Sequence, residues 1–233
     1  MAEVKSPNEP LAGRESSDLP PLRIHHLMIW MTVTGAIISG CMWFDRTTRN
    51  GPPITNTVVI ASLILGAVAI AAALTFFAFG FYWRRQGYVF PRQPGDLLLT
   101  IAATSALFVA DVIAGVFIIF FTFGDDDWQT AYYMIAMGIA LIAWGRMNAR
   151  GFARYADTTA WRFVYLMMIV APGIVLAMTF VGTLTTVPLT AVIACLVGAA
   201  ESDFRNHIDR RWTHWLGVFV MISLSAALVG IFG

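Results

Sequence analysis

The segment FVYLMMIVAPGIVLAMTFVGTLTTVPLTAVIACLVGAA, from Phe163 to Ala200, runs for 38 residues without a charged side chain. As one helix it would be about 57 Å long, nearly twice the roughly 30 Å hydrocarbon core of a bilayer. Gly182, three nearby threonines and Pro188 interrupt it, and this turn-like cluster disfavours a continuous helix. We therefore predict two transmembrane spans, about 163–182 and 186–200. A re-entrant half-helix is the alternative for the short second one.

The whole chain has the composition of a membrane protein. Of its 233 residues, 58% are hydrophobic and only 12% are charged, and the mean hydropathy is +0.70. A soluble domain carries about twice that share of charge. The 15 basic and 14 acidic side chains nearly balance, which excludes a basic nucleic-acid-binding protein. We predict an all-α integral membrane bundle.

Six apolar segments have the length of a span, because about 20 apolar residues of helix cross a bilayer, and residues 186–200 form a shorter seventh. The polar residues 1–22 are predicted to form a disordered tail, and residues 23–233 a single membrane domain. Eight tryptophans fall near the ends of the segments, where indole rings favour the headgroup zone. The predicted spans are about 24–44, 57–83, 97–123, 129–148, 163–182, 186–200 and 212–232.

Charge placement supports seven spans rather than six. With seven, 13 of the 15 Lys and Arg residues fall on one side of the membrane, and only Arg46 and Arg49 on the other. Cytoplasmic loops hold the excess of basic residues, so the amino terminus is predicted inside and the carboxyl terminus outside. No asparagine begins a glycosylation sequon, which is compatible with a bacterial inner membrane.

Asp111 is the one ionisable residue near the centre of a predicted span. A carboxylate at mid-bilayer costs about 2.5 to 3.5 kcal/mol on insertion scales, so we expect it to face the bundle interior and to have a partner. At helical spacing, polar and small residues form a stripe with it: Thr100, Thr104, Gly115 and Thr122. This intramembrane polar site is a proton or cation site, a carboxylate that acts in catalysis, or a hydrogen bond that holds helices together.

The four histidines form a second candidate site, because the predicted topology puts all of them at the cytoplasmic face. His25 and His26 open the first span, and His207 and His214 precede or open the last. In a continuous helix Asp203, His207 and His214 would share one face. Together these side chains could supply three or four ligands to a divalent metal ion.

In outline, seven spans with the amino terminus inside and a metal at the inner face are similar to the progestin and adiponectin receptor family of membrane zinc hydrolases. Asp111 lies in the span in which that family holds an aspartate. The second span here has no histidine, and His207 and His214 are seven residues apart rather than four. Retinal is excluded as a cofactor, because the chain's one lysine, Lys5, lies in the polar tail.

Two further features bear on function. Pro172 and Gly173 interrupt the fifth span and predict a kink that could serve as a hinge. Arginines at the inner rim predict contact with anionic lipid headgroups, and no protein partner is specified by the sequence. These are Arg84, Arg85, Arg146, Arg150, Arg154, Arg210 and Arg211.

The sequence favours a non-enzymatic structural, accessory or sensory membrane component. A transporter or ion-translocating protein that uses Asp111 is the second hypothesis. A metal-dependent membrane enzyme that uses the cytoplasmic histidines is the third.

Overall fold

The computed structural model describes residues 23–48, 56–123, 126–154, 158–181 and 186–232. Over these ranges the chain forms seven α-helices and no strand, which confirms the all-α prediction. The helices are α1 (Ile24–Thr48), α2 (Thr57–Arg85), α3 (Pro94–Phe123), α4 (Asp126–Arg154), α5 (Thr159–Val181), α6 (Thr186–Arg205) and α7 (Trp212–Phe232).

The chain is a helical membrane protein. Within the described residues, five helical segments are long and apolar enough to cross a bilayer, and they lie in α1, α2, α3, α6 and α7. The long uncharged run is divided as predicted, because α5 ends at Val181 and α6 begins at Thr186. With 20 residues, α6 is itself among the five, which disfavours a re-entrant half-helix.

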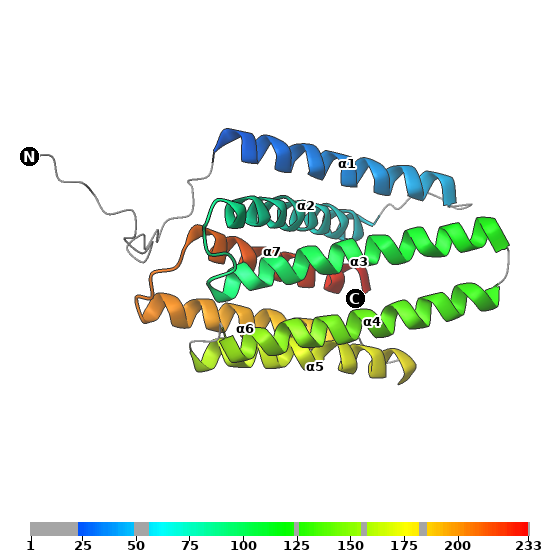
Figure 1. Cartoon of the computed structure of the whole chain (residues 1–233). Coiled ribbons are helices and arrows are strands. Elements are labelled where there is room, and N and C mark those ends of the chain that lie inside the picture. The colour runs from blue at the N-terminus through cyan, green and yellow to red at the C-terminus, as the bar shows by residue number, and fades with distance from the viewer. Residues whose placement is uncertain (1–22, 49–55, 124–125, 155–157, 182–185, 233) are drawn as a thin grey trace, which may run out of the picture.

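Successive helices run in alternating directions, so the starts of α1, α3, α5 and α7 meet the ends of α2, α4 and α6 (Figure 1, left). We call this the basic end, because 11 arginines of the described residues lie at or near it. They are Arg23, Arg84, Arg85, Arg92, Arg146, Arg150, Arg154, Arg162, Arg205, Arg210 and Arg211.

The hydrophobic core lies in the half of the bundle next to the basic end. Helix α7 packs against α2, α3 and α6, and α4 and α5 complete a ring from α3 back to α6 (Figure 1). Helix α1 packs on α2, where the Trp30 indole donates a hydrogen bond to the Val68 carbonyl at 3.1 Å. In α3, residues 97–103 are almost all buried, whereas most of residues 107–114 are exposed. The far ends of α3 and α4 extend beyond α5 and α7 (Figure 1).

Small residues allow α2 and α7 to approach closely. Gly66 of α2 faces the methyl group of Ala227, and Gly230 of α7 lies against the Ser62 hydroxyl. Ser62 and Ala227 are both buried. Helices in lipid associate through such close backbone approach, so these small residues form a packing interface between α2 and α7.

A second close helix contact is at the basic end, where α3 begins beside α7. A Cβ atom added to Gly95 would overlap the backbone of His214, and one added to Gly217 would overlap the backbone of Gly95. The two glycines therefore let the start of α3 touch the first turns of α7 without intervening side chains.

We predict that Gly217→Ala lowers the free energy of unfolding by about 1 to 3 kcal/mol, because the added methyl group must displace backbone. Gly138→Ala in α4 is the matched control, since nothing lies within 4 Å of its added Cβ atom. Denaturation of the two variants in detergent micelles checks this. Equal stabilities would show that α3 and α7 are not in close contact at this point.

Candidate functional site

Asp203, in the last turn of α6, is a fully buried carboxylate with three hydrogen-bond donors. The guanidinium of Arg210 donates to both carboxylate oxygens, from Nε at 2.8 Å and from the terminal nitrogen at 3.1 Å. The indole of Trp161, in the first turn of α5, donates at 2.9 Å. The side chain of Arg210 is only 5% exposed, so this is a buried, bidentate ion pair.

Arg210 reaches Asp203 because the chain reverses after α6. His207 has a positive φ of 52°, and the amide of Ile208 donates to the Asp203 carbonyl at 3.0 Å. The amide of His207 donates to the Phe204 carbonyl at 3.2 Å. These two bonds around a left-handed residue form a Schellman motif, which ends the helix and turns residues 206–211 back toward it.

His214, in the first turn of α7, joins this ion pair to the start of α3. Its Nδ1 accepts a hydrogen bond from the amide of Gly95 at 3.0 Å, and its Nε2 lies 3.5 Å from the Asp203 carboxylate. Because Nδ1 is an acceptor, the hydrogen-bond network assigns the ring hydrogen to Nε2, which faces the carboxylate. The Trp161 ring packs edge-on against the imidazole at 5.0 Å.

Asp96 is the second buried carboxylate at the basic end. Its Oδ2 accepts from the amides of Arg92 and Gln93, both at 3.1 Å, and its Oδ1 accepts from the Thr213 hydroxyl. Asp96 is the third residue of α3, behind Pro94. Its bond to the residue before the helix is the return half of a capping box, and a proline suits the first helical position.

Two further bonds connect loops and helix starts around Asp96. The side-chain oxygen of Gln93 accepts from the amide of Arg211 at 2.8 Å, and the buried Tyr165 hydroxyl donates to the Pro94 carbonyl at 2.8 Å. We call the whole set the basic-end network. Its members are Gln93, Asp96, Trp161, Tyr165, Asp203, Arg210, Thr213 and His214.

The basic-end network ties α3, α5, α6 and α7 together where each begins or ends. The charged and polar atoms named above face one another, and the side chains of Asp96, Asp203, Thr213 and His214 are buried. Buried carboxylates that receive several donors are held in one geometry. The arrangement is suited to fixing helix positions rather than to admitting a substrate.

The predicted metal site is not assembled among the described residues, where no three His, Cys, Asp or Glu side chains lie close enough to hold an ion. The continuous helix that would align Asp203, His207 and His214 is not formed, because α6 ends at Arg205. His207 is exposed on the turn. Asp203 and His214 alone come together, across the helix reversal.

His25 and His26 lie in the first turn of α1, which packs on α2. The Nδ1 atom of His26 accepts from the amide of Arg23 at 3.1 Å, which caps the helix start. Its ring packs edge-on against Phe79 of α2 at 4.2 Å, and His25 packs against His26 at 4.1 Å. These contacts account for both imidazoles as part of the α1–α2 interface.

Asp111 does not face the bundle interior, which corrects the expectation from its cost in lipid. It is exposed in the second half of α3, within residues 107–114, most of which are exposed. The threonines of its stripe bond within their own helix: Thr100 donates to the Asp96 carbonyl and Thr104 to the Thr100 carbonyl. Thr104 also contacts the Met147 sulfur of α4 at 3.6 Å.

The structure describes only some of the other residues that the sequence singled out. The side chain of Thr122 and the burial of Gly173 lie outside what the structure describes. Pro172 lies inside α5, which continues to Val181.

The arginines of the basic end divide into two groups. Arg84, Arg85, Arg146, Arg150 and Arg154 are exposed, as contact with lipid headgroups requires. Arg210 is turned inward to Asp203, so it is not exposed to headgroups. Arg211 is half-buried beside Gln93.

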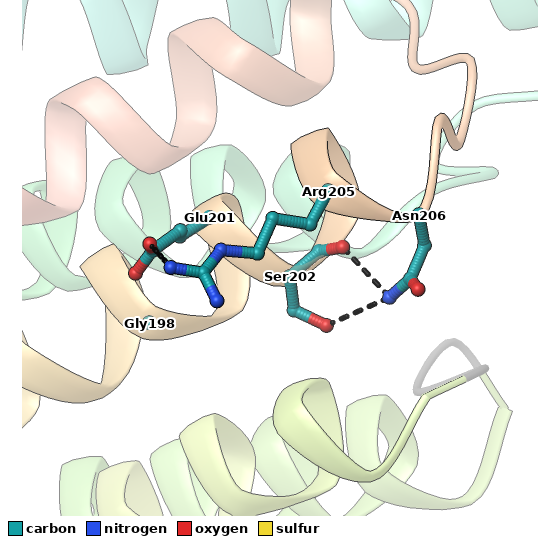
Figure 2. Close-up of a pocket in the computed structure, with 5 residues that line it drawn as sticks. All are labelled: Gly198, Glu201, Ser202, Arg205 and Asn206. Carbon is teal, nitrogen blue, oxygen red and sulfur yellow. Dashed lines mark hydrogen bonds and ion pairs between the residues drawn. The ribbon is translucent and has the colours of Figure 1, made fainter.

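A hollow of 270 Å³ lies on the last turn of α6 (Figure 2). Arg205 pairs with Glu201 at 2.6 Å, and the Asn206 amide donates to the carbonyl and the hydroxyl of Ser202. The paired side chains are 76% and 55% exposed, so the hollow is open surface. Gly198 completes its lining. It contains no buried charge, unlike the basic-end network.

Sequence reasoning did not identify Trp161, Tyr165 and Arg210 as members of one network. Trp161 was assigned to the membrane boundary with the other tryptophans, yet it is fully buried. The available signal was the run from Pro94 to Asp96, which places a proline and a carboxylate where a capping box needs them. No local pattern indicated that Asp203 and Arg210 pair across a turn.

Comparison of the chain with protein-family models, with curated proteins and with solved structures finds no match.

We predict that Asp203→Asn destabilises the bundle by about 3 to 5 kcal/mol, because it leaves the Arg210 guanidinium buried without its counter-charge. Glu201→Gln is the matched control. It removes an exposed ion pair on the same helix, two residues before Asp203, and should cost less than about 1 kcal/mol. Thermal unfolding in micelles compares the two, and similar losses would contradict a buried pair.

At position 207, glycine should be tolerated better than any other substitution, since the backbone of His207 is left-handed and its side chain is exposed. We expect His207→Gly to raise the free energy of unfolding by roughly 0.5 to 1 kcal/mol and His207→Val to lower it. Both variants remove the imidazole. If both lost stability equally, the imidazole rather than the turn would be what matters at this position.

Proposed function

We propose that the protein is a non-enzymatic integral membrane component that works by assembling with other membrane helices. In this proposal it crosses a bacterial inner membrane seven times, with the amino terminus in the cytoplasm and the carboxyl terminus outside. The alternating directions of the helices support an odd number of crossings. The gathering of arginines at the basic end supports that end as the cytoplasmic one.

The observation that carries the proposal is the exposure of Asp111 on the second half of α3. A polar side chain at this depth is costly in contact with lipid, and such residues normally face protein or water. The bundle itself does not enclose it. A helix of another protein chain could enclose Asp111. The exposed face of α3 is therefore best explained as an assembly surface.

The basic-end network is a second observation that supports the proposal. Its carboxylates and imidazole are the groups from which an acid–base or metal site could be built, and they are buried against one another. They hold four helices in fixed positions. A rigid basic end would present the arginine rim to anionic headgroups, as Arg84, Arg85, Arg146, Arg150 and Arg154 are placed to do.

Translocation of protons or cations is the second candidate function. The Asp111 carboxyl group lies near the middle of a predicted span, on the same side of α3 as Thr104. Translocation would require water to reach Asp111 from both surfaces. The two functions differ in what removal of the carboxyl does: loss of flux in one, loss of assembly in the other.

We expect a reporter fused after Gly233 to be active outside the cytoplasm and one inserted after Gly87, between α2 and α3, to be active inside. We also expect the protein, extracted in a mild detergent, to have a native mass above that of one chain. A cytoplasmic reporter after Gly233 would contradict seven spans. If the protein is a monomer and the Asp111→Asn substitution abolishes its proton flux in liposomes, the function is translocation and not assembly.

A further inference from the structure

The exposed face of α3 around Asp111 has the spacing of a helix-pairing seam. Leu107, Asp111 and Ala114 follow one another at steps of four and three. This is the alternation of the a and d positions of a left-handed helix pair. Leu107 is 50% exposed, and Asp111 and Ala114 are exposed. Thr104, one step earlier, is half-buried beside α4 and is not part of the seam.

The seam has a single strongly polar residue near its middle. In paired helices a polar side chain at one a position fixes the register and the number of strands, at a cost in stability. Asp111 occupies that place between Leu107 and Ala114. A partner helix must therefore offer a group at the same depth that can hydrogen-bond to a carboxyl.

Resting on the proposed function, we propose that the partner is a second copy of this chain, joined through α3 and its counterpart with the two Asp111 carboxyl groups bonded to each other. Two copies in one membrane have the same orientation, so a two-fold axis along the membrane normal puts identical residues at identical depth. The two carboxyl groups then meet directly. They bond by sharing protons between their oxygen atoms.

Self-pairing also agrees with the rest of the chain. The arginines of the described residues lie toward helix ends, so a second copy offers no cation at the depth of Asp111. What it does offer at that depth is its own carboxyl. Ala114, one step along the seam, is small enough for the two backbones to approach.

The test is cysteine cross-linking of the full chain in native membranes, in a background with Cys41→Ser and Cys195→Ser. Leu107→Cys and Ala114→Cys lie on the seam. Val109→Cys and Ile113→Cys are matched controls, because they lie two residues from Asp111, about 160° around the helix. The wild-type residues at 107, 109 and 113 are 50%, 56% and 51% exposed. We expect oxidation to give a dimer of the chain from the seam positions and little from the controls.

The carboxyl group is then tested in the Leu107→Cys chain. Asp111→Asn keeps a side chain that can pair with its copy and should retain the cross-link, whereas Asp111→Leu should lower the dimerisation constant by roughly tenfold. Equal cross-linking in both variants would overturn pairing through the carboxyl groups.

The remaining outcomes separate this inference from the proposed function. A cross-link from Leu107→Cys to a different protein would overturn self-pairing and leave assembly through α3 standing. Cross-linking from the control positions instead of the seam would overturn the seam. The absence of any product from all four positions would overturn both the dimer and assembly through this face.

Discussion

The buried ion pair between Asp203 and Arg210 is the interaction on which the arrangement of the helices depends. Charges removed from water are tolerated only when they are paired and when their remaining hydrogen-bonding capacity is used. Here the carboxylate receives two bonds from one guanidinium and a third from the Trp161 indole. The same carboxylate faces His214, whose other nitrogen holds the amide of Gly95. One side chain thereby connects α3, α5, α6 and α7.

Close packing makes these connections possible. The network works only because Gly95 and Gly217 let α3 and α7 touch, and because the Schellman turn at His207 brings Arg210 back under α6. Away from the basic end the constraints are weaker. In its second half, α3 exposes Asp111 and packs Gly115 against the Tyr132 side chain of α4. The basic-end network thus holds the helices together at one end of the bundle. Toward the other end, α3 has an exposed surface around Asp111.

Much of the fold could be predicted from the sequence, because hydropathy and helix-breaking residues are local signals. The seven apolar segments correspond to the seven helices, and the break between Val181 and Thr186 falls at the predicted turn cluster. The site could not be predicted in the same way. Asp203 and His214 were grouped for their spacing along one imagined helix, whereas a reversal of the chain brings them together. The inward position expected for Asp111 followed from its cost in lipid, which does not specify whether its own bundle or another chain encloses it.

A double-mutant cycle between Asp203 and Arg210 tests the central claim most directly. Asp203→Asn, Arg210→Gln and the double variant would be unfolded under the same conditions in micelles. If the pair organises the basic end, the double variant is more stable than the sum of the two single losses implies, by about 1 to 3 kcal/mol. Additive losses would show that the two side chains act independently and would contradict this account of the structure.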